Sequence, residues 1–201
     1  MDLLLRNANL LGGDRPVDVH VSGATVVAVG TIAIAGMRQV GYSKEFAAGI
    51  IANAGTSAAA RATEVSVEAL RMVTDTNFTG VYLTAREGAR RLIASGSRET
   101  GKGRIVLIGS ITSHLTGQGD SAYAAGKAAV AHLGRNLARE WVRQGVNVNT
   151  IQPGYIQTEI AGDWFQSLGG QAQIAAFHRK RLQPIDSLDA VMLYFSSDAS
   201  A

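Results

Sequence analysis

Three short apolar runs alternate with longer helix-like segments in the second part of the chain. The runs lie at residues 49–52, 104–108 and 146–151. The first two lack a strict alternation of polar and apolar positions, which is typical of strands covered on both faces of a sheet. Their connections are long enough to hold a helix, as parallel neighbours require. We therefore expect three adjacent parallel strands.

Helical periodicity fills these connections. Segment 66–95 carries apolar residues at helix-compatible spacings, and Ser66 is its candidate N-cap. Segment 121–144 stops before Gly145, and glycine commonly follows a helix end. A shorter helix is expected over 187–196. Because strands alternate with helices, the sequence predicts an α/β fold with a partial Rossmann-like, doubly wound parallel sheet.

The N-terminal part of the chain follows a different pattern. Gly-Gly-Asp and Ser-Gly separate short apolar runs there, which indicates hairpin turns rather than βαβ units. A change in composition follows near residues 30–41. We therefore divide the chain into a short β-rich N-terminal segment, 1–40, and an incomplete Rossmann-like domain, 41–201. The strands expected in the first segment are 3–11, 17–21, 25–29 and 31–34.

Composition narrows the possible functions. The 201 residues are 46% hydrophobic, which suits one packed domain. The chain has no cysteine, which excludes disulfides, thiolate metal sites and cysteine nucleophiles and favours a reducing compartment. The formal charge of +3 is scattered, which argues against nucleic-acid binding. No run reaches the roughly 18 apolar residues of a membrane span. We expect a cytoplasmic protein that binds neither nucleic acid nor membrane.

Candidate chemistry centres on Tyr123 and Lys127. Four residues apart on a helix, they share one face, and a nearby ammonium lowers the pKa of a phenol so that it can act as an acid or base. Ser110 follows an apolar strand, where open α/β sheets bind ligands. Two alternatives remain at this point. The Tyr–Lys pair can be an ordinary surface pair, and Ser113 competes with Ser110 for the catalytic position.

Five motifs in order along residues 49–200 resemble the short-chain dehydrogenase/reductase family. Members of that family are Rossmann-fold oxidoreductases that use NAD or NADP. The motifs are Asn53-Ala54-Gly55, Asn77 within TNFTGVY, Ser110 in IVLIGS, Tyr123 and Lys127 in SAYAAGK, and Pro153, Gly154 and Thr158 in QPGYIQTE.

The resemblance implies a role for each matching residue. Tyr123 exchanges a proton with the substrate oxygen, and Ser110 hydrogen-bonds the same oxygen. Lys127 holds the nicotinamide ribose and depresses the pKa of Tyr123, while Asn77 supports a water-mediated proton relay. Besides Tyr123 and Lys127, the implied cofactor-binding residues are Asn53, Ala54, Gly55, Pro153, Gly154, Ile156 and Thr158.

Trp164 and Phe165 lie where the family has a mobile substrate lid, although ordinary packing is the favoured explanation for this apolar pair. The family's glycine-rich turn, Thr-Gly-x-x-x-Gly-x-Gly, does not occur in the 201 residues. Because that turn holds the cofactor pyrophosphate, we expect weak cofactor binding. Residues 1–30 instead resemble the start of an amidohydrolase such as cytosine deaminase. The metal-binding histidine pair of that family does not follow, and no metal site is predicted.

The leading hypothesis is an NAD(P)-dependent oxidoreductase that interconverts a small alcohol and a ketone by hydride transfer, with weakened activity. The alternative is a non-catalytic α/β protein that keeps the family's association surface without tight dinucleotide binding. In either case segments 66–95 and 121–144 are expected to pair two copies, which gives a homodimer or homotetramer. The sequence does not choose between NAD and NADP, because the residue that senses the ribose 2′ position belongs to a strand that the resemblance does not include.

Overall fold

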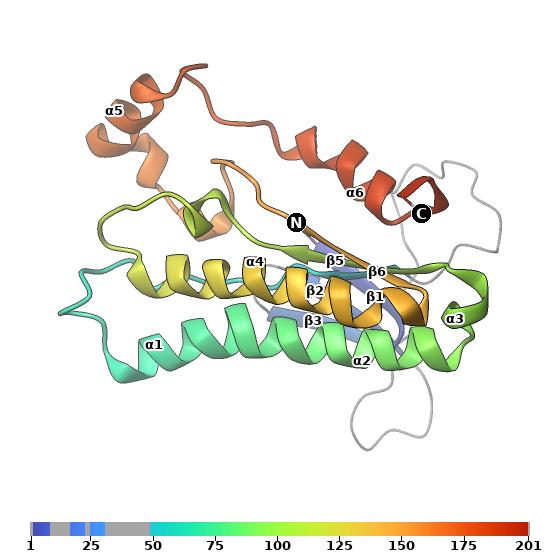
Figure 1. Cartoon of the computed structure of the whole chain (residues 1–201). Helices are drawn as coiled ribbons and strands as arrows, with labels where there is room; N and C mark the ends of the chain where they lie inside the picture. Colours follow the sequence, from blue (N-terminus) through green and yellow to red (C-terminus); the bar gives the residue numbers. More distant parts are fainter. Residues whose placement is uncertain (1, 9–16, 23–24, 31–48, 201) are drawn as a thin grey trace.

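The computed structural model describes residues 2–8, 17–22, 25–30 and 49–200 (Figure 1). Within these ranges the chain forms two separate three-stranded sheets, with orders β1-β2-β3 and β4-β5-β6. The strand expected at 31–34 lies outside the described residues. None of the described helices is long and apolar enough to cross a bilayer.

The second sheet is the parallel sheet that the sequence predicts. It consists of β4 (Gly49–Ala52), β5 (Gly103–Ile108) and β6 (Val146–Ile151). Strand β5 lies in the middle and pairs in parallel with both neighbours. Every residue of β5 is buried, as expected for a strand covered on both faces. The prediction of three adjacent parallel strands is confirmed.

The segment predicted as one helix over 66–95 is interrupted by a change in helical pitch. It comprises α1 (Val67–Thr74), the π-helical segment η1 (Asp75–Gly80) and α2 (Val81–Ala94). Ser66 is the N-cap, as predicted, and its side chain accepts a hydrogen bond from the Ala69 N–H. Periodicity could not reveal η1, because a single wider turn barely displaces the apolar face.

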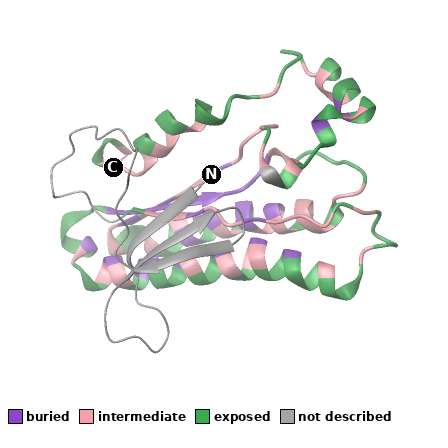
Figure 2. Cartoon of the chain, turned by 180° about the vertical axis from the view of Figure 1, so that it is seen from behind, coloured by how far each residue is buried: buried purple, intermediate pink, exposed green. Residues whose placement is uncertain are grey.

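The second long helix, α4 (Ser121–Trp141), continues into a short 3-10 turn, η3 (Val142–Gln144). Helices α2 and α4 pack on the same face of the sheet, and two glycines allow close approach. A Cβ on Gly88 of α2 would lie 2.7 Å from Ile50, and one on Gly134 of α4 would collide with the Thr150 side chain. Figure 2 shows buried residues on the sheet and on the helix surfaces that face it.

The C-terminal part covers the other face of the sheet. The helix expected over 187–196 is divided into η6 (Ile185–Leu188) and α6 (Asp189–Phe195). Helix α6 packs against Val106, Ile108 and Ile151. The sequence analysis missed the remaining short helices, which are α3 (Ser97–Thr100), η2 (Ile111–Ser113), η4 (Glu159–Ala161), η5 (Trp164–Gln166), α5 (Leu168–Ala176) and η7 (Asp198–Ser200).

A buried arginine fixes the end of the described chain. Arg104 in β5 is 1% exposed and donates to the carbonyl oxygens of Gly101, Gly103 and Ser197. It also lies 3.7 Å from the Asp198 carboxylate. A buried cation is tolerated only with such partners, so Arg104 holds the segment after α6 against β5.

The N-terminal sheet is antiparallel, as hairpin chemistry predicts. It contains β1 (Asp2–Ala8), β2 (Val17–Ser22) and β3 (Thr25–Gly30), paired in chain order. The division of the chain at residue 40 remains a prediction, because residues 31–48 are not described.

Candidate active site

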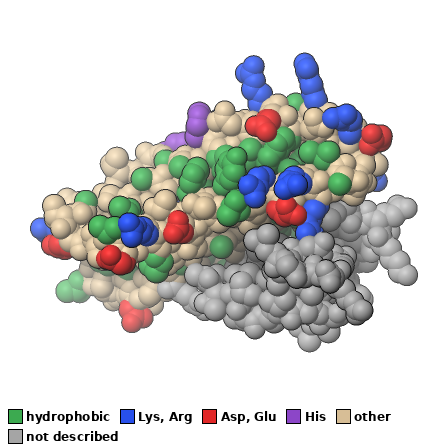
Figure 3. Space-filling model, turned by 90° about the horizontal axis from the view of Figure 1, so that it is seen from below, with side chains coloured by type: hydrophobic (Ala, Val, Ile, Leu, Met, Phe, Trp, Pro, Cys, Tyr) green, Lys and Arg blue, Asp and Glu red, His purple; other side chains and the backbone are tan. Residues whose placement is uncertain are grey.

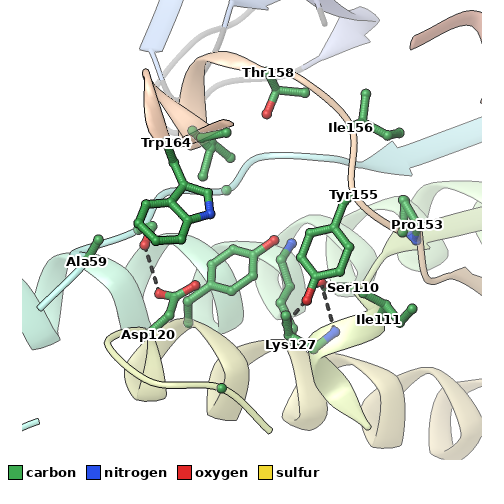
Figure 4. Close-up of a pocket in the computed structure, with 18 of the residues that line it drawn as sticks. Ala59, Ser110, Ile111, Asp120, Lys127, Pro153, Tyr155, Ile156, Thr158 and Trp164 are labelled. Atoms are coloured by element: carbon green, nitrogen blue, oxygen red, sulfur yellow. Dashed lines mark hydrogen bonds between the residues drawn. The ribbon is translucent and has the colours of Figure 1, made fainter. Parts of the chain in front are cut away.

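A cavity of about 760 Å³ opens where the parallel strands end (Figure 4). Its walls come from the segments that follow β4, β5 and β6, from the first turns of α4, and from the C-terminal part of the chain. The volume is within the range of roughly 300–1,000 Å³ found for small-ligand pockets. The position agrees with the rule that open α/β sheets bind ligands beyond the carboxyl ends of their strands.

Ser110, and not Ser113, faces this cavity. Ser110 is buried and is the N-cap of η2. Its hydroxyl oxygen accepts hydrogen bonds from the Thr112 N–H at 3.2 Å and from the Thr112 hydroxyl at 2.9 Å. These bonds occupy the lone pairs of the oxygen, so the Ser110 O–H is left to donate into the cavity. The Ser113 hydroxyl is buried without a hydrogen-bond partner among the described residues.

Tyr123 and Lys127 lie in the first two turns of α4 and both line the cavity. The Lys127 Nζ is 5.6 Å from the centre of the Tyr123 ring. Lys127 is 3% exposed, and its ammonium donates to the Ile108 carbonyl at 2.8 Å. The structure therefore brings three of the four predicted catalytic groups, Ser110, Tyr123 and Lys127, to one cavity, while their roles remain predictions.

The expected depression of the Tyr123 pKa is wrong. Burial raises the pKa of Tyr123, a hydrogen bond from Ser110 opposes the rise, and the charge of Asp120 adds to it. Burial also lowers the pKa of Lys127 from 10.5 to about 8. The spacing of Tyr123 and Lys127 accounts only for the attraction between an ammonium and a phenolate, whereas burial adds the cost of removing both charges from water.

Asn77 fixes the loop after β4 and is not among the residues that line the cavity. It is fully buried in η1. Its side-chain oxygen accepts from the Thr56 N–H, and its side-chain nitrogen donates to the Thr56 carbonyl, both at 2.8 Å. An amide that satisfies both backbone groups of one residue holds that residue in a single conformation. The water relay assigned to Asn77 stays a prediction.

Most of the residues assigned to cofactor binding reach the cavity. Ala54 is the exception. The loops after β5 and β6 are joined by a hydrogen bond from the Ile111 N–H to the Pro153 carbonyl, at 2.9 Å. The assigned residues that line the cavity are Asn53, Gly55, Pro153, Gly154, Ile156 and Thr158.

Sequence reasoning missed the contacts that shape the outer wall. Tyr155 stacks on Phe177, with ring centres 4.9 Å apart, and meets the edge of Phe165. The indole N–H of Trp164 donates to the Gln173 side chain at 2.7 Å. Phe165 is buried, Trp164 is half exposed, and both line the cavity. The pair therefore contributes to packing and also forms part of the cavity wall. The aromatic residues were the available signal, but Gln173 lies on α5 and Phe177 directly follows it, and this helix was not predicted.

A second missed contact crosses the mouth of the cavity. The Ser57 hydroxyl donates to the Asp120 carboxylate at 2.8 Å, and both residues line the cavity. Asp120 precedes α4, yet its side chain makes no capping bond to the helix. The position before a helix suggests a cap, so no sequence signal pointed to this alternative partner.

Comparison with known proteins identifies relatives of the described domain. The family model for short chain dehydrogenases matches residues 42–169. A short-chain dehydrogenase/reductase from Aspergillus versicolor, notP', is 33% identical over 160 residues, which are 76% of this chain and 53% of the relative. The chain spans about half the length of the curated relatives it matches.

Solved structures of dehydrogenases share the fold of this chain. A gluconate 5-dehydrogenase from Burkholderia cenocepacia, in complex with NADP and tartrate, has a TM-score of 0.69 and 27% identity, covering 75% of this chain and 57% of that one. A 4-hydroxyisoleucine dehydrogenase in complex with NADH has a TM-score of 0.68 and 26% identity, covering 75% and 60%. Because the family model matches more than half of this chain, the chain belongs to the short-chain dehydrogenases.

Proposed function

We propose that the protein is an NAD(P)-dependent oxidoreductase that interconverts a small alcohol and a ketone by hydride transfer. The observation that carries the proposal is the meeting of Ser110, Tyr123 and Lys127 at one cavity on the carboxyl rim of the sheet. NADP and NADH in the two similar structures support a nicotinamide cofactor of either kind. The non-catalytic alternative is not favoured, because it does not account for this convergence.

The residues at the inner end of the cavity suit such a cofactor. Lys127 has three N–H donors and gives one to the Ile108 carbonyl, which leaves two for ribose hydroxyls. Gly55 is buried and lies beside this ammonium. A Cβ on Gly55 would be 3.5 Å from the Lys127 Nζ. When bound, the nicotinamide supplies the hydride acceptor or donor.

Tyr123 is the residue that transfers the proton in this proposal. Because its pKa is raised, the phenol is protonated at neutral pH and is ready to donate to a carbonyl oxygen as a ketone is reduced. Oxidation of an alcohol requires the phenolate and is therefore favoured at alkaline pH. In this proposal the Ser110 O–H, which hydrogen-bonds Tyr123 in the structure, transfers its bond to the same oxygen and stabilises the negative charge that develops on it.

We also propose a homodimer or homotetramer formed through α1, α2 and α4. Large apolar side chains are exposed on the α1–α2 surface, among them Leu70, Met72, Tyr82 and Leu83. Figure 3, which views the molecule from that side, shows apolar side chains among charged ones. A cysteine-free composition fits a reducing compartment such as the cytoplasm.

The test measures binding and turnover separately. Purified protein is titrated with NADH and with NADPH by calorimetry, and a panel of secondary alcohols and ketones is then assayed by the absorbance of the reduced nicotinamide. We expect turnover that Tyr123→Phe removes while binding of the cofactor persists. Turnover that survives in Tyr123→Phe, or no binding of either cofactor at millimolar concentration, would overturn the proposal.

A further inference from the structure

The cavity contains an unexpected negative charge near its reacting group. Among the described residues that line it, Asp120 is the sole carboxylate. Asp120 is the N-cap residue of α4, three residues before Tyr123, and both side chains line the same cavity. Figure 4 shows the Asp120 carboxylate directed into the pocket, held by its hydrogen bond from Ser57.

The charge of Asp120 reaches the catalytic hydroxyl. It contributes to raising the pKa of Tyr123, since a neighbouring anion disfavours a phenolate. A substrate whose oxygen hydrogen-bonds Tyr123 therefore experiences the same field. Any further charged group on that substrate is attracted or repelled according to its sign.

Two cations also line the cavity, and their surroundings differ from those of Asp120. Lys127 is buried at the inner end, where its ammonium is bound to the Ile108 carbonyl. Arg61 is exposed, and water and salt screen an exposed guanidinium more than a half-buried carboxylate. Trp164 lines the same cavity and offers an aromatic face, which favours cations over anions.

We propose that Asp120 selects substrates by charge, so that the cavity prefers a secondary alcohol or ketone with an ammonium group to one with a carboxylate. This inference rests on the proposed function for the identity of the reacting group. The hydrogen bond from Ser57 positions the Asp120 carboxylate, and Trp164 adds an aromatic surface against which an alkylammonium packs.

The experiment uses three four-carbon secondary alcohols that differ only in their terminal group. They are 4-aminobutan-2-ol, butane-1,3-diol and 3-hydroxybutyrate, which are cationic, neutral and anionic. Dissociation constants are measured by calorimetry without cofactor, so that the result does not depend on turnover. We expect the ammonium compound to bind at least about tenfold more tightly than the carboxylate, with the diol between them.

The variant Asp120→Asn removes the charge and keeps an acceptor for Ser57. Its ratio of the two dissociation constants should fall close to one. Asp75→Asn, the same change at an exposed carboxylate that does not line the cavity, should leave the ratio unchanged. The inference is overturned if Asp120→Asn keeps the wild-type ratio, if the carboxylate compound binds most tightly, or if none of the three compounds binds.

Turnover of all three alcohols with NAD or NADP is followed in parallel. Charge selection in binding without any turnover would leave the Asp120 inference standing and count against the proposed oxidoreductase. Turnover of all three alcohols at equal kcat/KM would support the oxidoreductase and overturn the Asp120 inference. The two proposals therefore fail in different ways.

Discussion

The two faces of the β4–β5–β6 sheet are covered very differently. Among the described residues, the face under α2 and α4 holds a cluster of 11 that are buried, including Leu107, Val130 and Leu137. In the same part of the chain, the face under α6 holds three buried residues, Val106, Ile108 and Ile151, packed against side chains that are only partly buried. The first face is a dense core and the second is a lighter cover.

This difference separates two parts of the cavity. The proton-transfer groups Tyr123 and Lys127 belong to α4, which is anchored in the dense core. Leu188 and Met192, which line the outer part, belong to the lighter cover. Catalytic groups need fixed geometry, whereas a wall that surrounds the substrate tolerates change. We therefore expect changes on the dense face to affect folding or chemistry, and changes on the lighter face to affect substrate affinity.

The largest expected effect is the loss of proton transfer from the dense face. Tyr123→Phe removes the acid/base hydroxyl and should lower kcat by about a thousandfold, a typical contribution of general acid–base catalysis. The fold should be unaffected, because no hydrogen bond of the described structure depends on this hydroxyl except the one with Ser110. Steady-state rates and circular dichroism measure the two effects.

Tyr155→Phe is the matched control. Tyr155 also lines the cavity, but its ring is held by stacking on Phe177, which the substitution keeps. Its kcat should stay within about threefold of the wild-type value, since no proton transfer is assigned to it. Equal losses of kcat in both variants would contradict the division of the cavity into a catalytic part and a wall that surrounds the substrate.

A matched pair of leucines tests the two faces directly. Leu107 is fully buried in the dense core, and Leu107→Ala should lower the free energy of unfolding by about 2–5 kcal/mol. Leu188 is partly buried on the lighter face, and Leu188→Ala should cost less than about 1.5 kcal/mol while raising KM. Urea denaturation gives both energies, and similar costs would refute the contrast.

The buried ammonium of Lys127 gives the dense face a pH-dependent stability. Because burial lowers the pKa of Lys127 to about 8, the unfolded chain binds more protons than the folded chain between about pH 8 and 10. The free energy of unfolding should therefore rise with pH in this window, by about 2 kcal/mol. Below pH 8 the cost of burying the charge is present in full.

Lys127→Met keeps the bulk of the side chain and removes the titration. Its free energy of unfolding should be higher than that of the wild type at pH 7, and the two should converge toward pH 10. Urea denaturation at both pH values measures this difference. A constant difference across the window would show that Lys127 is not the titrating group.

The smallest expected effect is a shift in the pH profile of catalysis. The Asp120 charge helps to raise the pKa of Tyr123, so Asp120→Asn should lower that pKa. The rising limb of kcat/KM for alcohol oxidation should then move to lower pH, since oxidation requires the phenolate. Asp75→Asn should not move it. A shift toward higher pH would mean that Asp120 acts on another group.

The amino-acid sequence by itself determined the parallel sheet and the identity of the rim residues. An apolar run such as 104–108 favours a strand that is buried on both faces. The helix that carries Tyr123 and Lys127 fixes the spacing between them. Ser110 could be placed at the rim because it directly follows a strand. These are local properties, set by residues within a few positions of each other.

Only the tertiary structure decided what surrounds those residues. The bond between Ser57 and Asp120 joins positions 63 residues apart, and the bonds from Asn77 fix Thr56 on another element. The direction of the Tyr123 pKa shift likewise depends on burial by elements distant in the chain. Burial and electrostatic fields are sums over all neighbours in space, so they are defined only once the fold brings those neighbours together.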